Sequence, residues 1–276
     1  MFDDTKVASH YSHSQLVNAI EAGVRDIGHT PDSITVDDLA AVDEFHIGGR
    51  RASADLLGQL GLLSDHHVLD VGSGLGGTSR FLASNFGCRV SGIDLTPDYV
   101  ETGKVLCSWV GIAERVDLHC GSALAMPFEE SVFDAAVMLH VGMNIVDKAG
   151  LFAEVNRVLR PGAMFGIYDI MRQTDDPLVY PVPWAEKPDI STLGTPQEYR
   201  SALIDAGFEI TAERDRYEFA TEFFANLQQR MEAVGGPPPL GLHILLGDTA
   251  AVKVRNTMDN VIAGRVSPVE MVARKR

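Results

Sequence analysis

The spacing of apolar positions changes along the chain, from a helical period to an alternation of strands and helices. In the first 64 residues, apolar side chains recur at helical spacing in two separate segments. They are Leu16, Ile20 and Val24, and then Leu56, Leu57 and Leu60. Between these segments, residues 36–51 predict a turn-rich loop, because residues 43–49 read Asp-Glu-Phe-His-Ile-Gly-Gly. We therefore expect residues 1–64 to form an N-terminal helical cover.

From residue 66 onward, short apolar runs predict strands that alternate with helical patterns. The expected strands are residues 67–71, 89–93, 115–119, 133–140, 163–170, 208–217 and 266–273. Helix-start signals separate several of them: Pro97 follows Thr96, Asp147 opens a helix, and residues 195–198 form a capping box with proline at the first helical position. A glycine turn and a helix over residues 78–86 follow the first strand.

This alternation predicts an α/β fold, a doubly wound, mostly parallel seven-stranded sheet of the Rossmann-like kind. The sheet and its helices would occupy residues 65–276. Residues 220–264 do not fit a minimal version, because two helical patterns there flank a glycine- and proline-rich turn at residues 235–241. We expect this segment to be a helical, lid-like insertion before the last strand.

Composition limits the possible partners. The formal net charge of -15 would repel a phosphate backbone, which argues against nucleic acid. No run of about 18 apolar residues predicts a membrane span, and the acidic first residues do not resemble a signal peptide. The three scattered cysteines and the absence of a metal-binding motif predict a cytoplasmic protein without a metal.

The glycine-rich turn after the first expected strand indicates a cofactor site. Gly72, Gly74 and Gly77 match the dinucleotide pattern G-x-G-x-x-G, in which a pyrophosphate lies over the turn. Asp70 would stand close to that anion and repel it. S-adenosylmethionine (SAM) has no phosphate, and its ammonium and sulfonium charges would attract a carboxylate. The turn therefore favours SAM over a dinucleotide.

Further candidates follow the other expected strands, because ligands of such sheets bind at the carboxyl ends of the strands. Asp94 is placed to accept hydrogen bonds from both ribose hydroxyls, although it could also be an ordinary helix-capping acid. Ser122 and Ala123 would lie beside the adenine edge, where a plain turn is the alternative. Residues 140–144 would flank the same crevice after the fourth strand.

The chain resembles the class I SAM-dependent methyltransferases. The glycine turn and Asp94 carry this resemblance, together with residues 125–128 (Ala-Met-Pro-Phe), Phe133-Asp134 and residues 157–162 (Arg-Val-Leu-Arg-Pro-Gly). Residues 43–49 and 140–145 are similar to the branch that holds sarcosine/dimethylglycine N-methyltransferases and the C-methyltransferases of quinone biosynthesis. This resemblance implies SAM as the cofactor and S-adenosylhomocysteine as its product.

Carried over residue by residue, the resemblance assigns a role to each part of the cofactor site. It places Asp70, Gly72 and Gly74 around the methionine part, with Ser73 and Gly76 in the same turn. Asp94 would bind the ribose, Leu95 would cover an adenine face, and Ser122 and Ala123 would meet the adenine edge. The family commonly has aspartate where Ser122 stands, so this contact would lack charge assistance. His140 would border both the methionine part and the acceptor pocket.

Methyl transfer from a sulfonium needs a positioned nucleophile and, for an oxygen or carbon acceptor, a base. The candidate bases are His46, His140 and His243, for each of which a structural role is the alternative. Asn144 could orient the acceptor, or it could stabilise the turn before Asp147.

The expected function is methylation of a small molecule, with an amine nitrogen as the preferred acceptor. Methylation of carbon or oxygen in a quinone-like or aromatic intermediate is the alternative. A nicotinamide-dependent oxidoreductase and a non-catalytic SAM-binding protein are the alternatives from other classes. The sequence is compatible with a homo-oligomer.

Overall fold

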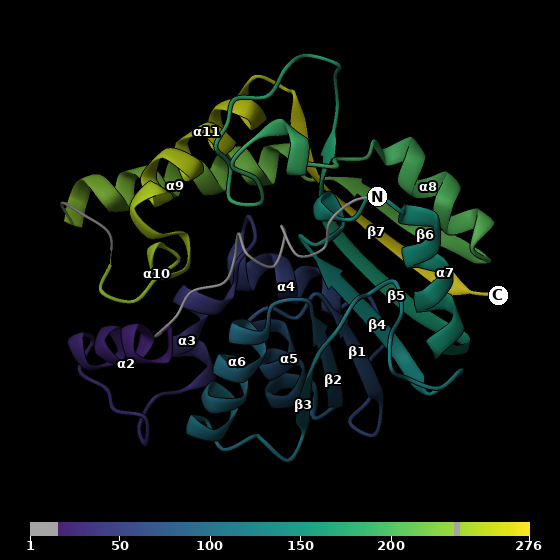
Figure 1. Ribbon diagram of the computed structural model, residues 1–276, viewed down its shortest axis with the longest axis horizontal. Coiled ribbons are helices and arrows are strands. Elements are labelled where there is room, and N and C mark those ends of the chain that lie inside the picture. The colour runs from purple at the N-terminus through teal and green to yellow at the C-terminus, as the bar shows by residue number, and fades with distance from the viewer. Residues whose placement is uncertain (1–15, 235–237) are drawn as a thin grey trace.

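The centre of the computed structural model is a seven-stranded sheet with helices on both faces (Figure 1). The structure describes residues 16–234 and 238–276. The strands are β1 (His67–Val71), β2 (Arg89–Asp94), β3 (Val116–Cys120), β4 (Phe133–Leu139), β5 (Leu159–Arg172), β6 (Phe208–Asp215) and β7 (Val266–Lys275). Their order is β3-β2-β1-β4-β5-β7-β6, and only β7 runs antiparallel to its neighbours. The predicted fold class is confirmed.

The order of the strands places a binding crevice between β1 and β4. The chain builds outward from β1 to β3 and then returns to add β4 on the other side of β1, so the direction of winding reverses there. Val71 at the end of β1 pairs with Ile93 of β2 and with Met138 of β4. The loops that follow these three strands therefore leave the sheet at the same edge.

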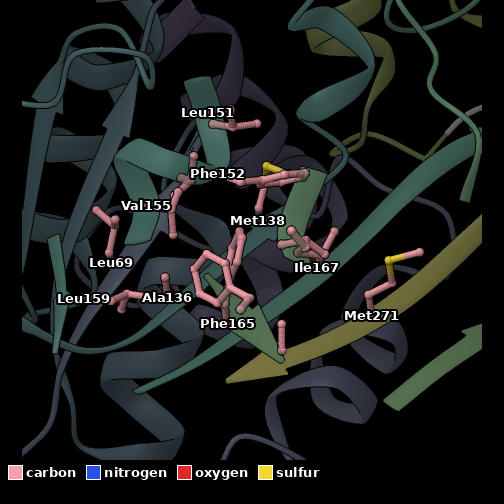
Figure 2. Packing of buried hydrophobic residues seen from close by; sticks show 14 of the residues in the cluster. Leu69, Ala136, Met138, Leu151, Phe152, Val155, Leu159, Phe165, Ile167 and Met271 are labelled. Atoms are coloured by element: carbon pink, nitrogen blue, oxygen red, sulfur yellow. The ribbon is translucent and has the colours of Figure 1, made fainter. Parts of the chain in front are cut away.

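The helices cover the sheet as the hydrophobic pattern requires. They are α2 (Leu16–Asp26), α3 (Val36–Asp43), α4 (Gly49–Leu57), α5 (Gly77–Phe81), α6 (Pro97–Trp109), α7 (Lys148–Val158), α8 (Pro196–Asp205), α9 (Tyr217–Val234), α10 (His243–Leu246) and α11 (Ala250–Ile262). A π-helical turn, η1 (Leu82–Phe86), continues α5. Figure 2 shows one layer of the core, where Phe152 of α7 packs against Met138 and Phe165 of the sheet.

The prediction of a turn-rich loop over residues 36–51 is wrong. Residues 36–43 form α3, because Thr35 and Asp38 make a capping box and Leu39 and Val42 are fully buried. α4 begins at Gly49, so only residues 44–48 remain as a turn. The turn lies where α3 and α4 meet, and both helices are held by the core.

Two other predicted boundaries also moved. The strand predicted over residues 163–170 begins earlier, at Leu159, directly after α7 ends at Val158. Residues 160–163 bulge out of β5, because Leu159 pairs with Phe133 and Met164 already pairs with Ala135. The strand predicted over residues 208–217 ends at Asp215, since Asp215 Oδ1 accepts a hydrogen bond from the Tyr217 amide at the start of α9.

Helices lie where the sequence predicts an insertion. α9 and α11 pack against each other, and α10 contacts α2 (Figure 1). Leu240 is buried among apolar residues of α2, α3 and α6. Residues 1–15 of the expected cover and residues 235–237 of the expected turn lie outside the described residues. Within the described ranges, none of the helices combines the length and the apolar character that spanning a bilayer requires.

Candidate active site

A large cavity opens at the carboxyl edge of the sheet, between the strand ends and helices α9 to α11. Its volume is about 1810 Å³. Most of the predicted site residues line it: Asp70, Gly72, Ser73, Gly74, Asp94, Leu95, Ser122, Ala123, His46, His140, Asn144 and His243. Residues from six separate segments of the sequence therefore meet at one site.

The glycine turn presents its backbone to the cavity at Gly74. Gly74 has a φ of 54°, and a Cβ atom there would meet no atom within 4 Å, so this position offers backbone to a ligand. Gly72 has a φ of 70° and packs on Val141, while its amide donates to the Ile93 carbonyl at 2.8 Å. Gly76 does not line the cavity. It precedes α5, and its missing side chain makes room for Leu118 and Arg80.

Asp94 holds the glycine turn and the start of α6 at the same time. Its two carboxylate oxygens accept hydrogen bonds from the amides of Gly74 (2.8 Å) and Thr96 (2.9 Å). A carboxylate offers about four lone-pair sites, so Asp94 keeps some for a ligand in the cavity. Burial raises the pKa of Asp94.

Asp70 is a buried carboxylate beside the glycine turn. It is 2% exposed, and the Ser79 hydroxyl donates to it at 2.6 Å. Burial, with a smaller contribution from the charge of nearby Asp94, raises the pKa of Asp70 to about 7. No basic side chain in the described ranges forms an ion pair with Asp70. The nearby Ser73 hydroxyl is also buried and has no hydrogen-bond partner in the described structure.

The adenine side of the predicted site is built from a turn. Ser122 Oγ accepts a hydrogen bond from the Leu124 amide at 3.2 Å, as the plain-turn alternative requires. Leu95, Ser122 and Ala123 nevertheless line the cavity beyond the ends of β2 and β3. These residues offer an apolar face and a hydroxyl, without a charge.

His140 is held in an unusual backbone conformation at the end of β4. Its φ of 55° lies in the left-handed region, which is uncommon for residues other than glycine and is often found at functional sites. The His140 amide donates to the Tyr168 carbonyl at 2.7 Å, and the His140 ring stacks on Tyr168 with centroids 5.2 Å apart. His140 Nε2 is buried and has no hydrogen-bond partner in the described part of the chain. Burial holds the pKa of His140 well below its usual value, and the charge of protonated His46 would lower it further.

His46 comes from the turn between α3 and α4, and its ring lies 5.8 Å from that of His140. Its Nε2 faces three oxygen atoms: Ser53 Oγ at 3.0 Å, Gly49 O at 3.1 Å and Glu44 Oε2 at 3.2 Å. A carbonyl and a carboxylate can only accept, so Nε2 carries the proton and Nδ1 keeps the lone pair in the neutral ring. Burial lowers the pKa of His46, although Glu44 opposes the shift.

The other two predicted catalytic residues have different surroundings. Asn144 Nδ2 donates to the Trp184 carbonyl at 2.9 Å and so connects the turn after β4 to the loop before α8. This contact is not made within the turn before Asp147, so it is neither of the two roles expected for Asn144. His243 begins α10 and lines the cavity from the inserted helices. The structure thus brings His46 and His140 together from two parts of the chain.

Four polar residues that support the site were not predicted from the sequence. Glu44 and Ser53 orient His46, and a buried ion pair joins Asp43 to Arg80 of α5. Arg80 and the Asp43 side chain are both fully buried. A charged side chain on the apolar face of a short helix, as at Arg80, is the one sequence signal that could have indicated this pair.

No metal centre is evident in the ranges that the structure describes, where His, Cys, Asp and Glu form no cluster of three or more able to hold an ion. Cys88, Cys107 and Cys120 are free.

Comparison with known proteins identifies the central part of the chain. Residues 69–167, which run from β1 through most of β5, match a family model described as a methyltransferase domain. Over this segment the chain is similar to the methyltransferase domain family, as the predicted resemblance requires. The match includes the glycine turn, Asp94 and His140, and so covers both sides of the crevice.

Curated relatives carry out several kinds of methylation. A sarcosine/dimethylglycine N-methyltransferase of Halorhodospira halochloris is 31% identical over 145 residues, which are 52% of this chain and 52% of that protein. A sterol 24-C-methyltransferase of Eremothecium gossypii is 28% identical over 187 residues, or 63% of this chain and 48% of that protein. The chain thus spans about half the length of these relatives.

Solved structures show the same fold over almost the whole chain. The [4+2]-cyclase SpnF is 21% identical, with a TM-score of 0.70 over 99% of this chain and 96% of that one. Geranyl diphosphate C-methyltransferase from Streptomyces coelicolor A3(2) is 18% identical, with a TM-score of 0.71 over 99% and 98%. At these identities the likeness shows the fold alone.

Proposed function

We propose that the protein is a SAM-dependent methyltransferase that acts on a small molecule. The observation that carries this proposal is the buried carboxylate of Asp70 with the partly buried carboxylate of Asp94 beside the glycine turn, and no basic partner for Asp70 in the described ranges. A site of this charge attracts a cationic ligand and repels the pyrophosphate of a dinucleotide. SAM carries an ammonium and a sulfonium charge, so it fits this site better than NAD does.

The residues present also fit the shape of SAM. Gly74 leaves open space at the turn, Asp94 keeps lone pairs for ribose hydroxyls, and Leu95 and Ala123 offer apolar surface to an adenine. When bound, SAM supplies an electrophilic methyl group on sulfur. The contribution of the chain is to hold the acceptor in line with that group, to exclude water and to accept a proton.

We infer that His46 accepts the proton that the acceptor loses. His46 is neutral near pH 7, its protonated Nε2 is fixed by Glu44, Ser53 and Gly49, and its Nδ1 lone pair, for which the described residues show no hydrogen bond, would act as the base. His140 is the second neutral imidazole at the site, and its unpartnered Nε2 can hydrogen-bond to the acceptor. The buried Glu44 would stabilise the imidazolium that forms.

The preferred methylated atom is an amine nitrogen. The relative from Halorhodospira halochloris is named for such a reaction, and the acidic surface of this chain suits a cationic amine, which would have to lose a proton before it reacts. Carbon or oxygen methylation is the alternative, since relatives named for each are also similar. A base at His46 serves all three reactions.

A second candidate function is catalysis without methyl transfer. The fold of SpnF, which is named a [4+2]-cyclase, matches this chain over nearly its full length. Such a protein would use the cavity to hold a reactive conformation and would form no S-adenosylhomocysteine.

Calorimetric titration with SAM, S-adenosylhomocysteine and NAD in parallel tests the cofactor. We expect binding of the two adenosyl ligands and none of NAD. Binding of NAD alone would instead indicate a nicotinamide-dependent oxidoreductase. Formation of S-adenosylhomocysteine on panels of amines, phenols and quinols then separates a methyltransferase from a cyclase or a non-catalytic SAM-binding protein.

Asp70→Asn should make the ligand-free protein more stable at pH 8 but weaken its affinity for SAM. The folded-state pKa of about 7 lies above the unfolded value of about 4, so the ionised carboxylate opposes folding. This cost is absent below about pH 4, grows as the pH rises and is complete above pH 7. Removing it should add about 2 to 4 kcal/mol at pH 8.

Urea unfolding of both proteins at pH 4.5 and pH 8 measures this effect. The stability gain should be confined to the higher pH, and SAM titration of the same samples should show the loss of affinity. If the Asp70→Asn variant binds SAM as tightly as the natural protein, Asp70 does not contribute to the cofactor site.

His46→Gln should slow turnover without weakening SAM binding. Glutamine can still donate to Ser53 and Glu44, but it has no imidazole lone pair to accept a proton. Loss of a general base typically slows a reaction about 100-fold or more. Once an acceptor is found, the rate of S-adenosylhomocysteine formation gives kcat, and calorimetry gives the SAM affinity. If kcat and the SAM affinity fall together, His46 belongs to the cofactor site and is not the base.

A further inference from the structure

The inserted helices give the cavity an apolar wall. Side chains from α9, α11 and the loop before α8 line this part of the cavity and pack into one hydrophobic cluster. They are Trp184, Phe223, Phe224, Leu227, Val254 and Met258. We call this part of the cavity the apolar chamber.

α9 contributes both apolar and polar side chains to the cavity lining. Phe223, Phe224 and Leu227 recur at helical spacing, while Glu222 and Gln229 are exposed. Polar residues of the later turns of α9 also line the cavity, namely Asn226, Gln228, Arg230 and Glu232. Most of these apolar side chains are only partly buried. An apolar face that is half covered and lines a cavity is suited to a ligand with an apolar body.

The chamber opens next to the proposed base. Phe219, in the first turn of α9, packs on Gly48, where a Cβ atom would lie 2.2 Å from the ring. Arg216 and Arg51 stand over the same ring at 4.2 and 5.1 Å, and Arg216 is anchored by Glu270 and Asp55. The base of α9 is therefore fixed against the turn that carries His46.

The size of the cavity separates two kinds of acceptor. The cavity of about 1810 Å³ includes the proposed cofactor site as well as the apolar chamber. It exceeds the volume of about 300 to 1,000 Å³ that is usual for a single ligand, so it has room for an acceptor beside the cofactor. An acceptor of only a few heavy atoms would leave the apolar chamber empty, and apolar cavities hold water poorly. A long or polycyclic apolar body would fill it and exclude water from the reacting atoms.

Building on the proposed function, we propose that the methyl acceptor carries a large hydrocarbon body. This body lies in the apolar chamber between α9 and α11, and the methylated atom faces His46 and His140. The proposal narrows the acceptor from small molecules in general to amphipathic ones with one polar end. Selectivity then comes from the fit of the body, and the polar end supplies the nucleophile.

Binding of linear primary alcohols from hexanol to dodecanol tests this proposal without knowledge of the methylated atom. Calorimetry with protein saturated with S-adenosylhomocysteine should show affinity that rises about three- to fourfold per added methylene, the value expected for burial of a CH₂ group. Affinity that does not change with chain length, or no binding at all, would overturn the chamber as the acceptor site.

Leu227→Glu should weaken dodecanol binding about tenfold or more, because it places a charge in the chamber. Gln229→Glu is the matched control: it adds the same charge at an exposed position of α9 outside the cavity lining and should change nothing. Val254→Thr replaces a methyl group with a hydroxyl at similar volume. This variant is the substitute test of weakened dodecanol binding if Leu227→Glu does not fold. Dodecanol affinity unchanged in the folded chamber variants would also overturn the proposal.

The two proposals fail separately. If S-adenosylhomocysteine does not bind, the proposed function is wrong, and the alcohol series can still be measured on the ligand-free protein. If S-adenosylhomocysteine binds and the alcohols do not, the methyltransferase assignment stands and the acceptor is not a large apolar molecule.

Discussion

Asp94→Ala is expected to reduce SAM affinity by about 100-fold or more. A carboxylate that accepts two ribose hydroxyl protons makes two charge-assisted hydrogen bonds, each contributing about 1.5 to 3 kcal/mol. The substitution also frees the amides of Gly74 and Thr96, which Asp94 holds at 2.8 and 2.9 Å. We therefore expect an additional loss of about 1 to 2 kcal/mol in the free energy of unfolding, as for other capping residues.

Asp94→Asn separates these two effects. Its amide oxygen can still accept from one of the two backbone amides, so stability should fall less, while the charge needed for the ribose is gone. Calorimetric titration with SAM and urea unfolding of all three proteins give the two quantities. A folded Asp94→Ala protein with unchanged SAM affinity would show that Asp94 only caps α6 and does not bind the ribose.

Asp43→Ala is expected to destabilise the protein by about 3 to 5 kcal/mol. It leaves the guanidinium of Arg80 fully buried without its anionic partner, and arginine cannot lose its proton to escape this cost. Arg80→Met should be milder, because the Asp43 carboxyl left behind can take up a proton. Its destabilisation should therefore grow as the pH rises.

Urea unfolding at pH 5.5 and pH 8 checks this asymmetry. The double variant Asp43→Leu/Arg80→Met removes both charges and should recover much of the stability lost in Asp43→Ala. Equal losses in both single variants at both pH values would show that the pair contributes packing rather than electrostatics. The ion pair also fixes the end of α3 on α5, so we expect the His46 turn to move when it is broken.

The parts of the fold that could be predicted are those in which local pattern and tertiary structure agree. β4 is buried on both faces and reads as a continuous apolar run, so its position was clear. The capping box at Thr195 and Glu198 also formed as expected. α3 was not predicted because the turn-forming residues 43–49 were extended to the whole of residues 36–51. Thr35 and Asp38 nevertheless carry a capping signal for a helix that begins at Val36.

The cofactor side of the site was easier to predict than the acceptor side. Asp70, Gly74 and Asp94 lie at strand ends, and the fold class alone brings strand ends together. The pairing of Glu44 and Ser53 with His46 depends on how α3 and α4 meet, and spacing along the chain does not show it. The contact of Phe219 with Gly48 joins segments that are far apart in the sequence, so no local pattern could indicate it.

The position of β7 has a consequence for the order in which the chain can fold. In the described ranges β6 pairs only with β7, and β7 is inserted between β5 and β6 although it follows both in the sequence. During synthesis, β6 and helices α9 to α11 all leave the ribosome before the strand that joins β6 to the rest of the sheet. β6 therefore has no partner strand until β7 emerges, and this edge is the last part of the sheet to form.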